Sequence, residues 1–313
     1  MYFDWPTPAQ MIYRLHRLRR LVLFCAIPPV CLLLLGAYLD PGFMPADRAT
    51  LAALAVVTLI AGHVILFPNV PLETVSLSLT VTLVAFVAPM IKTLSFMAPA
   101  EHASAALLFM VVLTVAAAGL LMFVLQLIIG LLLMVGPTVK LRMQSALLVD
   151  CSPAVAISQF TLKPGRRRGR VLTGPADSNG FFDVAILAPQ IADPDRPNQP
   201  LVMRVAAKMI DVRDKQQQTM LVLPNGAVTV TTESFEATAD GCRVTIAELP
   251  GDFTLGMYLM FWLTDQQMDN LTETADTITG VPARANGLAH GVSCLSIAAA
   301  VLSPRQPIAD QAD

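Results

Sequence analysis

The stretch that decides the fold of the C-terminal half is QQTMLVLPNGAVTVTTESFEATADGCRVTIAEL, residues 217–249. It contains three extended runs joined by two short turns, at Pro224-Asn225-Gly226 and at Asp240-Gly241. Asn-Gly and Asp-Gly pairs accept the positive φ angles that tight hairpins need. The stretch therefore predicts three consecutive antiparallel strands, over residues 217–223, 227–237 and 242–249.

The middle run also indicates how the sheet is exposed. Thr229, Thr231 and Ser234 show the β-branched and polar alternation of a strand that packs on one side only. We therefore expect a sheet with one wet face, which carries these side chains.

Three more extended runs lie upstream, at residues 145–151, 180–187 and 201–212. Downstream, no proline interrupts residues 253–279, which predict one long helix. Its first half, FTLGMYLMFWL, is apolar nearly all round and must be buried, whereas its second half is amphipathic. A last short helix is predicted over residues 288–302. Together these elements predict an α+β soluble domain with an antiparallel sheet and a long C-terminal helix.

The N-terminal half has a different composition. The 313-residue chain is 55% hydrophobic, and between Leu21 and Val139 it carries only six formal charges. Four apolar runs in this part approach or exceed the roughly 20 residues needed to cross a bilayer. They are residues 21–39, 49–67, 75–97 and 103–135. We predict four transmembrane helices within residues 21–139, a soluble domain over 140–303 and a disordered tail over 304–313.

Basic residues predict the orientation. Arginines precede the first span, and Lys140 and Arg142 follow the fourth. The positive-inside rule then predicts a multi-pass protein of the cell inner (plasma) membrane, with both termini and the soluble domain in the cytoplasm. Residues 1–20 predict an amphipathic helix at the inner membrane surface. We expect Arg17, Arg19 and Arg20 to contact lipid headgroups, or to act only as a topology signal.

Polar residues are few within the spans. His63, Lys92 and Gln126 each stand alone, without a partner carboxylate at helical spacing. Ion or substrate pathways usually carry more ionisable groups. The spans are therefore predicted to anchor the protein or to pack against partners rather than to transport.

A sheet followed by a long helix resembles the START-like, helix-grip superfamily of polyketide cyclases and lipid-transfer proteins. The matching stretches are Asp150-Cys151-Ser152-Pro153, residues 235–245 and the terminal helix, which lie within residues 145–280. The resemblance implies a curved sheet that grips a helix around a hydrophobic cavity. The candidate lining residues are Phe182, Met209, Met220, Met257 and Phe261. The alternative is that these side chains fill a closed core.

A cluster of arginines is the strongest local charge signal. Arg166, Arg167, Arg168 and Arg170 could bind phosphate, from inner-leaflet headgroups or from a nucleotide. With Asp177-Ser178-Asn179-Gly180 downstream, the cluster resembles the cyclic-di-GMP-binding PilZ pattern, although the second half differs in spacing. The alternative is a solvated basic loop next to the membrane.

The sequence predicts no catalytic, metal or cofactor site. The four histidines, His16, His63, His102 and His290, are far apart in the chain, and no cysteine–histidine ligand spacing occurs. Gly291-Val292-Ser293-Cys294 does not match a nucleophile elbow. The net charge of −2 gives no attraction to nucleic acid.

Three hypotheses for the function follow. The first is a non-catalytic, membrane-anchored domain that binds a hydrophobic small molecule or a lipid. The second is a structural subunit or assembly factor that packs against other membrane proteins. The third is a membrane-bound enzyme, for which His290 and Asp183 are the candidate residues to mutate.

Overall fold

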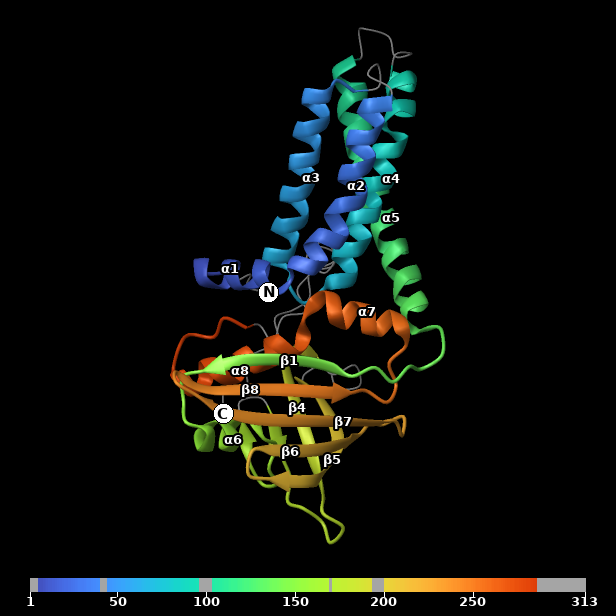
Figure 1. Cartoon of the computed structure of the whole chain (residues 1–313). Helices are drawn as coiled ribbons and strands as arrows, with labels where there is room; N and C mark the ends of the chain where they lie inside the picture. Colours follow the sequence, from blue (N-terminus) through green and yellow to red (C-terminus); the bar gives the residue numbers. More distant parts are fainter. Residues whose placement is uncertain (1–4, 40–43, 96–102, 169–170, 193–199, 286–313) are drawn as a thin grey trace. The chain divides into compact units, whose positions relative to one another are not determined.

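The computed structural model describes residues 5–39, 44–95, 103–168, 171–192 and 200–285 (Figure 1). The chain divides into two compact units. A helical unit is built mainly from Arg14–Met134. A sheet unit is built mainly from Val135–Gly291 and also takes the first thirteen residues, Met1–Tyr13.

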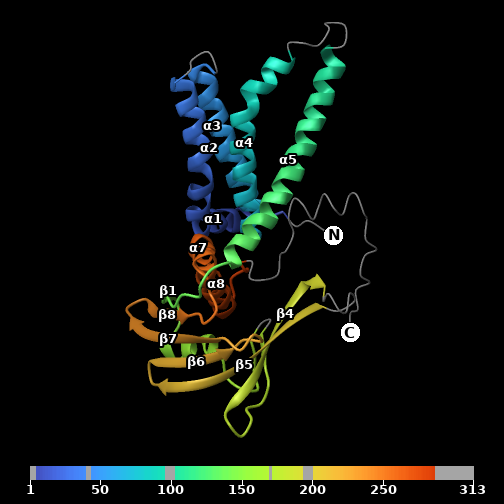
Figure 2. The ribbon, with the colours of Figure 1, turned by 90° about the vertical axis from the view of Figure 1, so that its right-hand side faces the viewer.

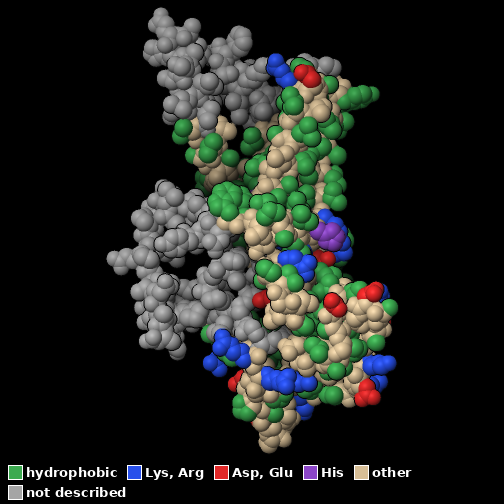
Figure 3. All heavy atoms as spheres, turned by 90° about the vertical axis from the view of Figure 1, so that its left-hand side faces the viewer, with side chains coloured by type: hydrophobic (Ala, Val, Ile, Leu, Met, Phe, Trp, Pro, Cys, Tyr) green, Lys and Arg blue, Asp and Glu red, His purple; other side chains and the backbone are tan. Residues whose placement is uncertain are grey.

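All four predicted apolar runs form helices. After the short helix α1 (Pro8–Arg17), they are α2 (Arg19–Leu39), α3 (Ala46–Leu66), α4 (Pro71–Ser95) and α5 (Ala103–Met134). Hydrophobic side chains cover much of their described surface (Figure 3). Leu35, Leu51 and Leu131, for example, are 54%, 66% and 67% exposed. Apolar surface of this extent is typical of helices that face lipid, and the chain is a membrane protein.

Three helices, not four, are long and apolar enough to cross a membrane over the part of the chain that the structure describes. They are Arg19–Leu39, Ala46–Leu66 and the Val112–Met134 part of α5. In α4 the described apolar stretch is shorter, Pro71–Phe86. The helix starts four residues before the predicted run, and its first turns bury polar side chains such as Glu73, Thr74 and Ser76.

The sheet has eight strands in the order β1-β8-β7-β6-β5-β4-β3-β2, with every neighbouring pair antiparallel. The strands are β1 (Met143–Val149), β2 (Arg167–Arg168), β3 (Val171–Thr173), β4 (Phe181–Ala192), β5 (Pro200–Arg213), β6 (Gln216–Val222), β7 (Val228–Thr238) and β8 (Gly241–Leu249). All six predicted strands are present. Figure 2 shows β4 and β5 running steeply across the direction of β6, so the sheet curves strongly.

Both predicted hairpins are confirmed. In the β6–β7 turn, Gly226 has a φ of 80° and Asn225 Oδ1 accepts a hydrogen bond from the Ala227 amide at 3.0 Å. In the β7–β8 turn, Gly241 has a φ of 134°, and a Cβ atom there would lie 2.3 Å from the Val149 carbonyl oxygen. Glycine is therefore required at position 241 by both backbone conformation and space.

The single long helix predicted over residues 253–279 is wrong. Two helices stand there, α7 (Leu255–Thr264) and α8 (Gln266–Thr279), drawn separately in Figure 1. The break is at Asp265, whose φ and ψ are both 47°. Aspartate is one of the few residues besides glycine that visits this left-handed region, and the break coincides with the change from apolar to amphipathic sequence. The predicted helix at 288–302 and the tail at 304–313 lie outside the described residues.

One buried apolar cluster packs two helices of the sheet unit against the sheet. Helix α6 (Pro153–Phe160), capped by the Ser152 hydroxyl, packs its Phe160 against Phe235 of β7 and Leu271 of α8. The other buried members are Val149, Ala156, Cys242, Val244 and Ala275. This cluster fixes α8 against the sheet and determines which side of α8 faces the remaining space.

Candidate ligand-binding cavity

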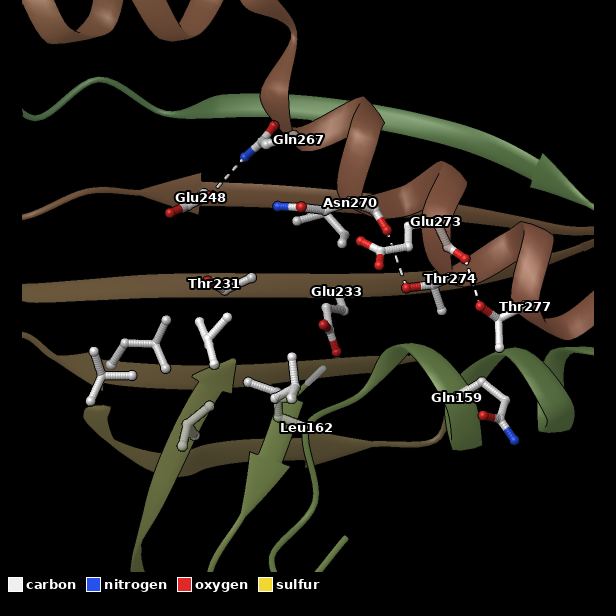
Figure 4. A pocket seen from close by; sticks show the side chains of 16 residues that line it. Gln159, Leu162, Thr231, Glu233, Glu248, Gln267, Asn270, Glu273, Thr274 and Thr277 are labelled. Carbon is white, nitrogen blue, oxygen red and sulfur yellow. Dashed lines mark hydrogen bonds between the residues drawn. The ribbon is translucent and has the colours of Figure 1, made fainter. Parts of the chain in front are cut away.

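A cavity of ≈ 370 Å³ lies between the curved sheet and α8 (Figure 4). Its apolar lining comes from the strands and from the loop after α6: Leu162, Val171, Val184, Ile186, Val205, Leu221 and Ile246. Its polar lining is Gln159, Thr231, Glu233, Glu248, Gln267, Asn270, Glu273, Thr274 and Thr277. The cavity therefore has an apolar side and a side rich in hydrogen-bonding groups.

Helix α8 supplies much of the polar side. Gln267, Asn270, Thr274 and Thr277 recur three or four residues apart and so share one face of the helix. Figure 4 shows these side chains together with Glu273 along the helix. Leu271 of α8 is fully buried in the apolar cluster. The polar residues of α8 line the cavity instead.

Strands β7 and β8 extend the polar side. Thr231 pairs directly with Glu248, and Glu233 pairs with Ile246, so these side chains share one face of the sheet. Glu233 is only 7% exposed. Gln267 Nε2 donates a hydrogen bond to Glu248 Oε2 at 3.2 Å, drawn dashed in Figure 4.

The Glu248 carboxyl has a perturbed pKa. Burial raises its pKa, and the hydrogen bond from Gln267 lowers it in part. A raised pKa keeps a larger share of the carboxyl protonated, and a protonated carboxyl can donate a hydrogen bond as well as accept one.

None of the five side chains predicted to line a cavity lines this one. Phe182 and Met209 belong to the apolar cluster that also contains Val184 and Val205 of the cavity wall. Met220 precedes Leu221 on β6, and successive strand residues point to opposite faces. Ligand contact by these three residues stays a prediction.

The other two lie on α7. Phe261 packs edge-on against Phe253, with ring centroids 5.6 Å apart, and Met257 is half-buried. Neither residue is part of the cavity lining, and their contact with a ligand also stays a prediction. The expectation that this apolar segment is buried is only partly met: Tyr258 and Leu263 are buried, whereas Leu255, Leu259 and Trp262 are 67%, 41% and 54% exposed.

Two threonines correct the sequence interpretation of the sheet. Thr229 is 4% exposed, and Thr231 lines the cavity, so neither lies on an outer wet face. Ser234 lies on the opposite face from Thr231, an odd number of residues away. Alternation of polar and apolar residues shows only that one side of a strand carries polar side chains. The pattern is the same whether that side faces bulk water or a polar cavity.

A second hollow of ≈ 380 Å³ adjoins the cavity and contains part of the predicted arginine cluster. Its lining is Ser158, Gln159, Thr161, Leu162, Lys163, Arg166, Arg167, Val171 and Thr173. Arg168 lies in β2, and Arg170 lies outside the described residues. Arg167 and Arg168 form β2, which pairs with β3.

Hydrogen bonds to the backbone hold the β2–β3 hairpin in place. The Thr173 amide donates to the Arg166 carbonyl at 2.9 Å, and the Arg166 amide donates to Thr173 Oγ1 at 2.8 Å. The Arg166 guanidinium also donates to the Ser158 carbonyl at 3.4 Å. Downstream, the Asp177 carboxylate accepts from the amides of Asn179 and Phe181, both at 2.8 Å, so this part of the PilZ-like pattern forms a turn.

The arginines of α1 and of the start of α2 separate into two kinds. Arg14 and Arg17 are buried, and their guanidinium groups donate to the carbonyls of Ile65 and Pro68, at 2.5 Å and 3.3 Å. Arg17 is thus turned toward the end of α3. Arg19 is exposed and Arg20 half-buried, so these two are the remaining candidates for headgroup contact, which stays a prediction. On the apolar side of the same segment, Ile12 is 70% exposed.

The expectation that His63 stands alone is wrong. Its Nε2 lies 3.0 Å from Glu73 Oε1, and its Nδ1 lies 3.1 Å from Thr74 Oγ1. The side chains of His63 and Glu73 are 3% and 0% exposed. The partners lie across the α3–α4 turn, ten and eleven residues away, so a search at helical spacing could not find them.

Asp183, the described one of the two residues proposed for catalysis from the sequence, does not line the cavity. Asp183 of β4 is exposed and lies between Phe182 and Val184, which are buried on the other face. His290, Ser293 and Cys294 lie outside the described residues. Among the described residues, no group of three or more histidine, cysteine or acidic side chains could hold a metal ion.

Comparison with known proteins finds solved structures only. No protein-family model matches the sequence, and no curated protein matches it significantly. A protein from Staphylococcus saprophyticus is 14% identical, with 47% of this chain and 99% of that chain covered and a TM-score of 0.32. A protein from Nitrosomonas europaea is 15% identical, with 45% and 95% covered and a TM-score of 0.31.

A third similar structure has a described role. The di-domain aromatase/cyclase StfQ from the steffimycin biosynthetic pathway is 13% identical, with 45% of this chain and 52% of that chain covered and a TM-score of 0.30.

Proposed function

We propose that this chain is a membrane-anchored protein whose START-like domain binds a small amphiphilic molecule between its sheet and α8. The single observation that carries the proposal is the cavity of ≈ 370 Å³ with an apolar side and a hydrogen-bonding side. A volume in this range is typical of sites for small molecules, which are lined mainly by apolar groups with a few convergent polar ones.

The two sides of the cavity define the class of ligand. Val184, Val205 and Leu221 offer only apolar contact, whereas Asn270, Glu273 and Thr274 of α8 offer donors and acceptors. A molecule with hydrocarbon on one side and hydroxyl, carbonyl or amine groups on the other satisfies both. A wholly apolar molecule would leave the buried polar groups without partners, which costs free energy.

The helical unit anchors this domain to the membrane in our proposal. Helix α4 has 25 residues, which is long enough for the bilayer core of about 30 Å, and it would supply the fourth span. Four spans and the arginines before α2 favour a cytoplasmic location for both termini and for the sheet unit. Protease protection of a C-terminal tag in right-side-out and inside-out membrane vesicles tests this orientation.

Ligand binding is tested with two substitutions at adjacent positions on β6. Leu221 lines the cavity, and Met220 points to the opposite face of the sheet. Native mass spectrometry of the full-length protein is expected to show a bound small molecule. We expect Leu221→Trp, which fills the cavity, to lose this molecule and Met220→Trp to retain it. Equal occupancy in both variants, or no bound molecule in the parent protein, would contradict the proposal.

A second candidate function is catalysis on the bound molecule. It is favoured by the raised pKa of Glu248, since a protonated carboxyl inside an apolar site can act as a general acid. Glu233 on the same face of the sheet would be the second carboxyl. Extracted ligand is incubated with the parent protein and with Glu248→Gln. Conversion only by the parent protein supports catalysis, and an unchanged ligand in both supports binding alone.

A further inference from the structure

The second hollow has an electrostatic character opposite to that of the cavity. Lys163, Arg166 and Arg167 line it, and its lining contains no acidic side chain. The cavity lining contains Glu233, Glu248 and Glu273 and no basic side chain. An anionic group would be repelled by the glutamates of the cavity and attracted to the cations of the second hollow.

The two spaces share a boundary. Gln159, Leu162 and Val171 line both the cavity and the second hollow. Leu162 and Val171 also belong to the apolar cluster under β4 and β5, so the shared boundary is mainly hydrocarbon. One molecule can therefore place its apolar part against the sheet and extend a charged end past these residues.

A buried hydroxyl independently indicates a ligand at the second hollow. Thr161 lines the hollow and is 4% exposed. Its Oγ1 has no hydrogen-bond partner among the residues that the structure describes. Buried hydroxyl groups in folded proteins nearly always have a partner, so this one is available to donate to an anionic oxygen.

The backbone that carries Lys163 and Arg166, which line the same hollow as Thr161, is held by hydrogen bonds to Thr173. Thr173 Oγ1 donates to the Lys163 carbonyl at 2.6 Å and accepts from the Arg166 amide at 2.8 Å. Both hydrogen bonds join the Thr173 hydroxyl to the backbone of the segment that carries Lys163 and Arg166, and they fix this segment. Guanidinium groups bind carboxylate and phosphate oxygens through charge-assisted hydrogen bonds, which are stronger than neutral ones.

We infer that the ligand of this domain carries an anionic end, a carboxylate or a phosphate, bound in the second hollow by Thr161, Lys163, Arg166 and Arg167 while its remainder occupies the cavity. This inference rests on the proposed function. It narrows the ligand class from an amphiphile to an anionic amphiphile.

The test compares two probes that differ only at one end. Decanoic acid and decanol, each with a photoactivatable diazirine in mid-chain, are cross-linked to the full-length protein in nanodiscs of neutral lipid, and the labelled peptides are identified by mass spectrometry. We expect both probes to label peptides that line the cavity, with the acid binding more tightly. Lys163→Gln/Arg166→Gln/Arg167→Gln is expected to weaken binding of the acid about tenfold and to leave the alcohol unchanged.

Control substitutions separate a local contact from a general loss of positive charge. Arg204→Gln/Arg243→Gln removes two exposed arginines that alternate with the inward-facing Val205 and Val244, and it is expected to affect neither probe. Thr161→Val retains the shape of the side chain and removes the hydroxyl. We expect it to weaken binding of the acid alone, and it serves as the folded variant should the triple substitution fail to fold.

The outcomes distinguish this inference from the proposed function. Equal binding of acid and alcohol, unaffected by the basic substitutions, overturns the anionic end and leaves cavity binding intact. Labelling of the cavity by neither probe overturns both. Acid binding that depends on the basic residues but survives Leu221→Trp shows a headgroup-like contact without a tail in the cavity, and this result also overturns the inference.

Discussion

Gln267 of α8 and Glu248 of β8 meet across the cavity through a hydrogen bond of 3.2 Å from Gln267 Nε2 to Glu248 Oε2. The bond joins the helix to the sheet at the polar side of the candidate site. It also holds in place a carboxyl whose pKa is raised by burial. The two side chains therefore link the stability of the sheet unit to the protonation state of its cavity.

We predict a pH-dependent gain in stability for Glu248→Gln. As pH rises through 4.5, the ordinary glutamate pKa, the unfolded chain loses this proton before the folded chain does. The parent protein is then destabilised until the pH exceeds the raised folded-state pKa. Glutamine retains an acceptor for Gln267 and never ionises, so its advantage should grow over this pH range and then level off.

Thermal unfolding of both proteins at a series of pH values measures this difference. A constant difference between Glu248→Gln and the parent protein at all pH values would contradict the assignment.

The tight β7–β8 turn predicts that adding one methyl group at position 241 greatly lowers the stability of the fold. In Gly241→Ala, the new Cβ would lie 2.3 Å from the Val149 carbonyl oxygen, and the φ of 134° is unfavourable for alanine. We expect a loss of at least about 2 kcal/mol in the free energy of unfolding, because backbone atoms of β1 must move.

The β6–β7 turn provides the comparison. In Gly226→Ala, no atom lies within 4 Å of the new Cβ, and only the positive φ opposes the change. We expect about 1 kcal/mol there. Equal losses in the two variants, measured by denaturant unfolding, would contradict this explanation.

The two hairpins show which parts of the fold are predictable from local sequence. Asn225-Gly226 and Asp240-Gly241 indicate their turns through the positive φ angles that they accept, and the strands on either side follow from alternation. The short strands β2 and β3 carry no such signal, since two and three residues are too few to show a period. They form because the chain that follows α6 returns to the edge of β4.

The candidate site was less predictable than the sheet. The resemblance to the START-like superfamily implied aromatic and methionine lining residues such as Phe182 and Met257, whose contact with a ligand stays a prediction. The observed polar lining comes from residues such as Asn270 and Thr274, which would read as a solvent face on any amphipathic helix. The cavity opposite this polar face of α8 exists because the sheet is curved, and that curvature depends on contacts between strands far apart in the sequence.

The break between α7 and α8 predicts a preference for glycine. Asp265 has a left-handed backbone conformation, with φ and ψ of 47°. We expect Asp265→Gly to be neutral or stabilising and Asp265→Val to lose about 1–2 kcal/mol, because a β-branched side chain clashes with its own backbone in this region. The control is Gln266→Val, at an exposed helical position one residue away, which should lose less than about 1 kcal/mol. Thermal unfolding orders the three variants, and a Gly variant less stable than the Val variant would contradict the prediction.

The buried pair in the helical unit predicts strong coupling between His63 and Glu73. Their side chains are almost completely buried, and Nε2 and Oε1 lie 3.0 Å apart. Removing one partner leaves the other without this contact in a medium of low polarity, which typically costs about 3–5 kcal/mol. We therefore expect His63→Leu and Glu73→Leu to be strongly destabilising singly, and the double variant to lose clearly less than the sum of the two.

A double-mutant cycle measured by thermal unfolding in one detergent gives the coupling energy, which we expect to be at least about 1 kcal/mol. The control pair is Thr58→Val with Glu73→Leu, because the Thr58 hydroxyl donates to the Leu54 carbonyl within α3 itself. Losses that add in the control cycle but not in the His63–Glu73 cycle support a specific pair across the α3–α4 turn. Additive losses in both cycles would mean that each side chain contributes independently, and the pair would then not fix the packing of α3 against α4.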